Sequence, residues 1–317
     1  MLAVPTKGFA RSVNVHRISH DVLCDWIEGS LLFQDDRDFL SQIDVADTLL
    51  DDGRYINQEF ALQGMKGAWN ELRNRERWIG DGAAAFVRRK RVIRRGNWQS
   101  YPAQSFCILV SLAPYYDWWT ESEYGEQGEI FELLTKASFS AQFCGWKVFK
   151  TGWSSSNPVR LRDIATEVAN LLGEQLGDIE TWDDPEKKEP GQKKEQGLDL
   201  LCYRPFPDKR RGIPVYLMQC ASGAYWESKL HTPILGIWKD IIHFKNSPMK
   251  AFSTPFTVTR REKYRQYLGQ VTGLFIERCR LLAAAQYNEK WVSRELQDRI
   301  IAWAEPRIER LLQVSER

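Results

Sequence analysis

Apolar residues recur at intervals of three and four along the first hundred positions, with charged residues between them, a spacing typical of amphipathic helices. The clearest segments are LCDWIEGSLL, FLSQIDVADTLLDD and EFALQGMKGAWNELRNRERWIG. No group of catalytic residue types accompanies them. Residues 1–100 are therefore predicted to form a mainly helical N-terminal region that supports or recognises another molecule.

From residue 101 the pattern alternates between helical and extended periods. EQGEIFELLTKASFSAQF and LRDIATEVANLLGEQLG each carry an apolar stripe at helical spacing, and GWKVFKTGW between them alternates as a short strand. Residues 183–197 lack large apolar side chains and predict a solvated loop. GLDLLCYRPF and IPVYLMQC, separated by the turn PDKRRG, then read as a hairpin.

The remaining sequence predicts one more strand and two long helices. MKAFSTPFTV has the strand pattern, whereas TRREKYRQYLGQVTGLFIERCRLLAAA and EKWVSRELQDRIIAWAEPRIERLLQ have the helical one. The expected fold class is α/β (α+β), with a mixed sheet flanked by helices over residues 101–317 and long helices at the C-terminal end.

Composition places the chain among ordinary globular proteins. Its 317 residues are 43% hydrophobic and 27% charged, with a net charge of +2. No stretch approaches eighteen uncharged apolar residues, and the N-terminus lacks the pattern of a secretory signal, so a cytoplasmic protein without membrane association is expected. The six cysteines are scattered without a CxxC pair, and they are predicted to be reduced and buried.

Positive charge is concentrated in two short segments. Residues 87–95, VRRKRVIRR, contain six cations, and Lys209, Arg210 and Arg211 lie in the turn PDKRRG. Both segments are compatible with solvated surface and with contact to a nucleic-acid backbone. The sequence alone leaves these alternatives open.

One glutamine interrupts an apolar strand. Gln219 follows the apolar run 213–217, and a polar side chain in a covered strand costs free energy unless it has a partner. Asp199 stands between two leucines in the preceding strand of the predicted hairpin, so the two side chains are expected to be neighbours. Carboxylate and amide oxygens are hard ligands, and the pair predicts a site for Mg²⁺ or Mn²⁺.

Three short motifs carry a family resemblance. Phe131 and Glu132 precede the strand GWKVFKTGW, Gly197 and Asp199 open the next strand, and Gln219 ends the apolar strand after it. In this order the chain resembles the PD-(D/E)XK superfamily of restriction-endonuclease-like nucleases, most closely the Mrr-type branch with glutamine in place of the second acid. The resemblance covers roughly residues 125–235.

The resemblance implies a metal-dependent DNA endonuclease with a restriction-endonuclease-like sheet. Glu132, Asp199 and Gln219 would be its metal-binding and catalytic residues. The fuller pattern, GLDLL with PFPD and QCASG followed by Trp226 and Lys229, is also similar to a group of bacterial proteins associated with defence against phage. DNA, a protein partner of a defence system and a second copy of the chain in a homodimer are the implied partners.

The chain departs from this family at one critical position. The lysine expected two residues after Gln219 is Ala221, and Lys229 is the replacement predicted from the sequence. Glu167 competes with Glu132 for the role of first acid. The missing lysine also supports an alternative function, a catalytically degenerate nuclease fold that binds DNA or a partner within a defence complex.

Overall fold

The computed structural model describes residues 1–120, 124–151, 160–182 and 196–315. The chain divides into two compact units. Unit 1 comprises residues 1–123, 255–260 and 277–317, and unit 2 comprises residues 124–254 and 261–276. Most of the predicted loop at 183–197 and the break SSSNP lie outside the described residues.

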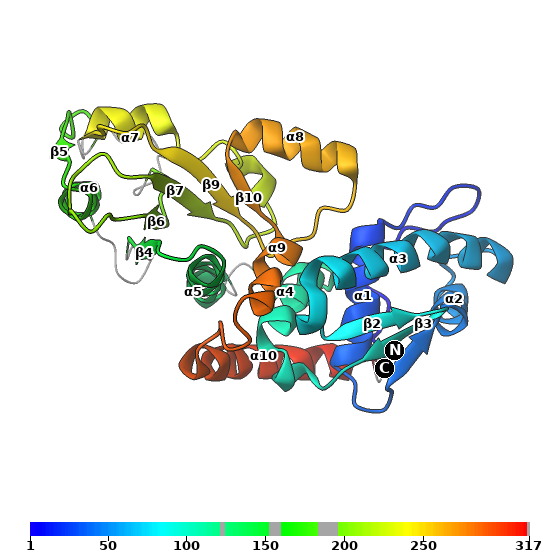
Figure 1. Cartoon of the computed structure of the whole chain (residues 1–317). Helices are drawn as coiled ribbons and strands as arrows, with labels where there is room; N and C mark the ends of the chain where they lie inside the picture. The colour runs from blue at the N-terminus through cyan, green and yellow to red at the C-terminus, as the bar shows by residue number, and fades with distance from the viewer. Residues whose placement is uncertain (121–123, 152–159, 183–195, 316–317) are drawn as a thin grey trace. The chain divides into compact units, whose positions relative to one another are not determined.

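Unit 1 combines helices with a small antiparallel sheet (Figure 1). The sheet has the order β1–β3–β2, formed by β1 (Phe39–Ser41), β3 (Arg91–Arg94) and β2 (Ala85–Arg88). The helices are α1 (His20–Leu32), α2 (Gln42–Asp51), α3 (Gln58–Ile79), α4 (Pro102–Leu112), α9 (Arg278–Leu282) and α10 (Arg294–Ser315). Residues 1–100 are thus mainly helical, as predicted, but the prediction missed the small sheet.

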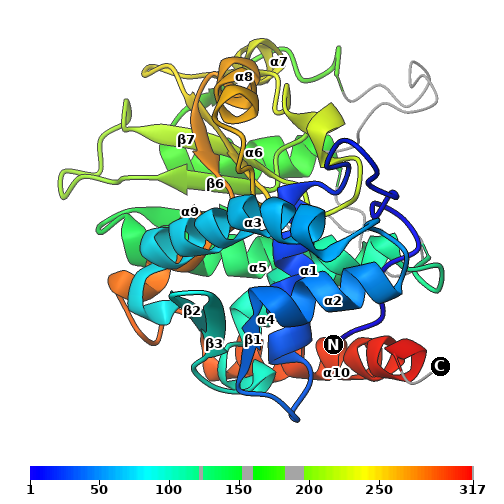
Figure 2. The same ribbon diagram turned by 90° about the vertical axis from the view of Figure 1, so that its right-hand side faces the viewer.

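The helices of unit 1 pack around α1 and α4, which are almost entirely buried. Helices α3 and α4 both contact α1, and α10 packs against α4, as Figure 2 shows. Because α10 joins this core, the C-terminal helix belongs with the N-terminal region. This division differs from the one expected from the sequence, which placed a boundary at residue 100 and the C-terminal helices with the second region.

A buried ionic network crosses the core of unit 1. Asp25 accepts a hydrogen bond from Arg75 at 2.6 Å and one from Arg278 at 2.6 Å. Arg75 also contacts Glu28 at 2.6 Å, and Arg278 donates to Ser111 at 2.6 Å. Burial alone would raise the pKa of Asp25, but the two guanidinium groups outweigh it and hold the pKa below its ordinary value.

Unit 2 is built on a five-stranded mixed sheet with the order β10–β9–β7–β6–β4. Its strands are β4 (Lys147–Lys150), β6 (Leu200–Tyr203), β7 (Val215–Cys220), β9 (Met249–Ser253) and β10 (Leu274–Ile276). Strands β4, β6 and β7 pair antiparallel, whereas β9 is parallel to both β7 and β10. The predicted hairpin is confirmed as β6 and β7, and the predicted strands at 147–150 and 249–253 are present.

Helices cover both faces of this sheet. They are α5 (Tyr124–Gln142), α6 (Leu161–Leu172), α7 (Leu235–Ile241) and α8 (Arg261–Val271), and a small sheet pairs β5 (Gln175–Leu176) with β8 (Ile242–His243). Tyr216 contacts Phe139 of α5, whereas Leu217 packs with α6 and α7. Consecutive strand residues point to opposite faces, so α5 lies on one face and α6 with α7 on the other.

The prediction of one long helix over residues 259–285 is wrong. Helix α8 ends at Val271, and residues 274–276 form strand β10 before α9 begins. A Cβ at Gly273 would lie 2.0 Å from the backbone oxygen of Lys250, so only glycine lets the chain pass β9 this closely. Three consecutive apolar residues then complete the sheet edge, a local switch that helical periodicity did not reveal.

Candidate active site

The end of the β6–β7 hairpin brings the predicted aspartate and glutamine together. Leu200 is opposite Met218, so one position further along Asp199 faces Gln219. The Gln219 Nε2 donates a hydrogen bond to the Asp199 Oδ2, and the backbone N–H of Cys220 donates to the same oxygen at 2.6 Å. Both side chains are buried, with 8% and 3% exposed. The polar residue that interrupts the apolar strand therefore has a carboxylate partner.

Gly197 is required by the space around this pair. Its φ is +72°, a left-handed conformation that side-chain-bearing residues rarely adopt. A Cβ at this position would lie 2.7 Å from the Thr232 Cβ and 2.9 Å from the Gln219 Oε1. The glycine that precedes Asp199 by two residues thus permits the close approach of the chain to Gln219.

Thr232 holds the other end of the Gln219 side chain. Its hydroxyl lies 3.1 Å from the Gln219 Oε1 and 2.7 Å from the backbone oxygen of Lys229. A hydroxyl has one proton, so it donates fully to only one of these two acceptors. If the proton goes to the Lys229 carbonyl, the Thr232 oxygen can itself accept a hydrogen bond from an amide nitrogen.

A second pair of polar side chains, this one an ion pair, comes from α5 and β4. The Glu132 Oε2 lies 2.9 Å from the Lys150 Nζ, and 16% and 22% of the two side chains are exposed. Lys150 is opposite Leu200, the residue directly after Asp199. An ammonium group is therefore available beside the hairpin end, on the face of the sheet that α5 covers.

Cys220 lies between the two pairs. Its burial raises the pKa of the thiol well above the ordinary value, and the carboxylates of Asp199 and Glu132 raise it further. Thr135 of α5 hydrogen-bonds the sulfur. Both carboxylates therefore act electrostatically on the same atom. By strand alternation, Gln219 shares the α6–α7 face of the sheet with Leu217, whereas Cys220 and the Glu132–Lys150 pair lie on the α5 face.

The other residues singled out in the sequence have different positions. Lys229 ends the short 3-10 helix Trp226–Lys229, and its backbone carbonyl accepts hydrogen bonds from the Thr232 hydroxyl at 2.7 Å and the Thr232 backbone N–H at 2.9 Å. Glu167 lies exposed on α6, away from the buried stripe of that helix. The ion pair of Glu132 with Lys150, next to the end of β6, favours Glu132 over Glu167 as the acid of this site.

Lys150 is the site residue that sequence reasoning missed. The alternating pattern of GWKVFKTGW identified its strand, but the pattern does not say which strand is the neighbour. Pairing of β4 with β6, which are separated by α6 and a long connection, places Lys150 opposite Leu200, the residue after Asp199.

Metal-binding capacity at this site depends on the glutamine. Within the described ranges, no three His, Cys, Asp or Glu side chains are grouped to hold a metal ion. The Asp199 carboxylate and the amide oxygen of Gln219 are hard oxygen donors, which suit Mg²⁺ or Mn²⁺ rather than zinc. In the observed orientation the amide nitrogen faces Asp199, so the amide must rotate before its oxygen can serve.

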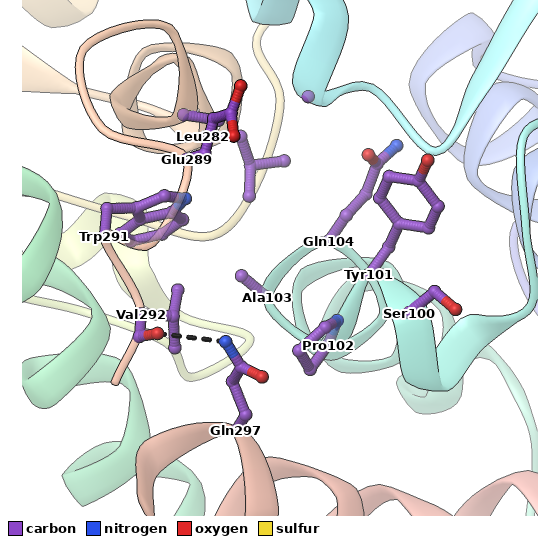
Figure 3. A pocket seen from close by; sticks show the side chains of 12 residues that line it. Ser100, Tyr101, Pro102, Ala103, Gln104, Leu282, Glu289, Trp291, Val292 and Gln297 are labelled. Atoms are coloured by element: carbon purple, nitrogen blue, oxygen red, sulfur yellow. Dashed lines mark hydrogen bonds between the residues drawn. The ribbon is translucent and has the colours of Figure 1, made fainter. Parts of the chain in front are cut away.

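A pocket of about 160 Å³ lies in unit 1 and contains none of these residues. Figure 3 shows Tyr101 and Gln104 on one side and Trp291 on the other. Gln104 is buried and accepts a hydrogen bond from the Ala84 backbone N–H at 2.8 Å. Glu289 is the one carboxylate in the lining, which has no histidine, lysine or arginine. The pocket therefore lacks the paired groups that acid–base chemistry needs.

Comparison with known proteins gives no assignment. The chain matches no protein-family profile, no curated protein and no solved structure. In the described part of the chain, no helix has the length and apolar character needed to cross a membrane.

Proposed function

We propose that unit 2 is a metal-dependent endonuclease that hydrolyses phosphodiester bonds in DNA. The observation that carries this proposal is the Asp199–Gln219 pair at the end of the β6–β7 hairpin, with the Glu132–Lys150 ion pair formed from α5 and the neighbouring strand β4. The order of α5 with Glu132, strand β4, strand β6 directly after Asp199 and strand β7 with Gln219 next to its end agrees with the resemblance noted in the sequence; α6 and β5 intervene between β4 and β6.

Asp199 and Gln219 would hold the divalent cation, whereas Glu132 lies on the α5 face of the sheet and pairs with Lys150. When bound, Mg²⁺ or Mn²⁺ supplies Lewis acidity, which lowers the pKa of an attacking water and offsets charge on the phosphate. After rotation of the amide, the Gln219 oxygen would face the Asp199 carboxylate. These side chains face each other across two hydrogen-bonded strands, so the backbone fixes their separation.

Rotation of the Gln219 amide is compatible with its surroundings. In the observed orientation its nitrogen donates to Asp199 and to the Cys220 carbonyl, at 3.1 Å for the latter. After rotation the nitrogen would donate to the Thr232 oxygen, whose proton goes to the Lys229 carbonyl. The amide oxygen would then face two other oxygens, an arrangement that is repulsive without a cation and favourable with one. Thr232 is accordingly a positioning residue of the site.

Lys150 takes the role that the family assigns to the lysine missing at Ala221. Its ammonium is held by Glu132 and belongs to a strand paired with β6. A fixed positive charge near a phosphate stabilises the negative charge that builds up during hydrolysis. Lys150 therefore replaces Lys229 as the lysine we assign to the reaction.

The test is cleavage of plasmid DNA by the full chain with Mg²⁺ or Mn²⁺. We expect Asp199→Asn and Lys150→Met to lower the rate by about 100-fold or more, the usual cost of removing one preorganised charge from a transition state. Lys147→Met is the matched control, because Lys147 lies on the same strand, is exposed and pairs opposite Tyr203 at the far end of β6. Equal cleavage by wild type and Asp199→Asn would refute the proposal.

A second function is favoured by the hydrogen bonds of Asp199. Its Oδ2 is already satisfied by the Gln219 amide and the Cys220 N–H, and Ala221 stands where the family has lysine. A nuclease fold that binds DNA or a partner protein without cutting would keep this arrangement. DNA binding without metal-dependent cleavage, together with wild-type binding by Asp199→Asn, would select this function.

A further inference from the structure

The β2–β3 hairpin of unit 1 ends in four consecutive cations. Arg88 is opposite Arg91, and Arg89 and Lys90 form the two-residue turn between them. All four side chains are exposed. We call residues 88–91 the basic hairpin tip.

The basic hairpin tip costs the isolated protein free energy in two ways. Like charges directly opposite each other on paired strands repel, as Arg88 and Arg91 do. Arg89 has φ +58°, a conformation that two-residue turns usually give to glycine or asparagine and that costs other residues about 1 kcal/mol. A hairpin that served stability alone would carry neither feature.

Cations at the base of the same hairpin are neutralised, whereas those at its tip are not. Arg94 pairs with Asp38 at 3.1 Å, and Arg95 lies 4.0 Å from Glu76. In the described ranges, no carboxylate forms an ion pair with any residue of the basic hairpin tip. The uncompensated charge is therefore confined to the turn.

Neighbouring residues hold the tip in place. The Arg73 guanidinium of α3 donates to the Arg89 backbone oxygen at 2.9 Å, adding a further exposed cation beside the turn. The Arg91 guanidinium lies over the Phe39 ring, 4.3 Å from its centroid. Part of the entropy of ordering these side chains is thus already lost before a ligand binds.

We propose that the basic hairpin tip binds the phosphodiester backbone of a nucleic acid. Guanidinium groups match phosphate oxygens in a two-pronged geometry, and three of the four tip residues are arginines. Residues 88–91 include no apolar side chain that could insert into a bilayer, which favours a nucleic acid over an anionic membrane. Backbone contacts position a nucleic acid without reading its sequence. This binding role does not depend on the nuclease activity proposed for unit 2.

The experiment measures binding of the full chain to a short fluorescent DNA duplex by anisotropy, with a chelator present, between 50 and 200 mM salt. Each lost phosphate contact reduces the salt slope by about 0.9. The triple variant R88Q/R89Q/K90Q should therefore reduce the salt slope by about 2.7. Raising the salt from 50 to 200 mM should then weaken binding by the variant about 40-fold less than it weakens binding by wild type. R88K/R89K should keep the wild-type slope, because the charge remains.

The matched control is K209Q/R210Q/R211Q, which removes three cations from the β6–β7 turn, where Arg210 lies beside Asp208. We expect it to leave the slope within one contact of wild type. Equal loss in both triple variants, no change in R88Q/R89Q/K90Q, or no binding by wild type at 50 mM salt would each overturn the proposal.

Two further arms define the ligand. Single-stranded RNA tested in the same way shows whether the shared phosphodiester chemistry extends beyond duplex DNA. Stronger hairpin-dependent binding to anionic phospholipid vesicles than to either nucleic acid would overturn the assignment. The chelator blocks cleavage, so these binding curves do not depend on nuclease activity. Failure of the nuclease proposal would appear as equal cleavage by wild type and Asp199→Asn and would leave the binding curves unaffected.

Discussion

Replacing Gly197 with alanine tests the packing on which the candidate active site depends. Two costs add: the left-handed φ of +72° costs an alanine about 1–2 kcal/mol, and overpacking typically costs about 1–3 kcal/mol. The new Cβ would stand 2.7 Å from Thr232 and 2.9 Å from the Gln219 oxygen. We expect Gly197→Ala to lower the free energy of unfolding by about 2–5 kcal/mol, measured by urea denaturation followed by circular dichroism.

Gly212→Ala separates the two costs. Gly212 also has a positive φ, +81°, but its nearest neighbour for a Cβ is the Lys245 Cβ at 3.9 Å, an ordinary contact. This variant should lose only the backbone contribution, about 1–2 kcal/mol. If the two variants lose equal stability, the close contact of Gly197 with Gln219 and Thr232 does not exist in solution, and the geometry of the site is wrong.

Further predictions concern both units. Thr232→Val should weaken Mn²⁺ binding to unit 2, measured by electron paramagnetic resonance, while Thr232→Ser retains it; equal affinities would exclude amide rotation. Arg278→Met should cost about 3–5 kcal/mol in urea unfolding, because Asp25 loses one of its two buried guanidinium partners; a loss under 1 kcal/mol would contradict this. The lowered pKa of Asp25 contributes stability that is present above its unfolded value of about 3.9 and is lost as pH falls through the folded value, so Asp25→Asn should flatten the acid limb of unfolding. Exposed Cys144 should react with a thiol reagent at pH 8, whereas Cys107, whose pKa burial raises to about 12, should not; labelling that survives Cys144→Ser would contradict this.

Local pattern in the sequence was enough for the elements that carry the site. The apolar spacing of α6, the turn between β6 and β7 and the alternation in β4 all correspond to observed elements. Helical and extended periods arise from contacts within a few residues, so a single segment contains the information. The same reasoning identified Asp199 and Gln219, because a polar residue in an apolar strand requires a nearby partner.

Cysteine burial shows the limit of that reasoning. Five of the six cysteines are free and buried as predicted, but Cys144 is exposed. Cys144 lies just after the end of α5, outside the helical repeat, so the apolar spacing of the helix does not predict whether it is buried. The break between α8 and β10 was missed for a related reason, since the need for Gly273 comes from the passing backbone of β9.

By itself, the sequence determined most of the helices, the strands β4, β6, β7 and β9, and the two polar residues that face each other in one hairpin. Tertiary structure decided which segments share a unit, since α10 packs with α4 and the two are far apart in the chain. It also placed Lys150 opposite Leu200 through pairing of β4 with β6, and Thr232 against Gln219 through the fold of the chain after β7. Strand pairing and helix packing join residues of distant sequence position, and no local period encodes which of several apolar faces will meet.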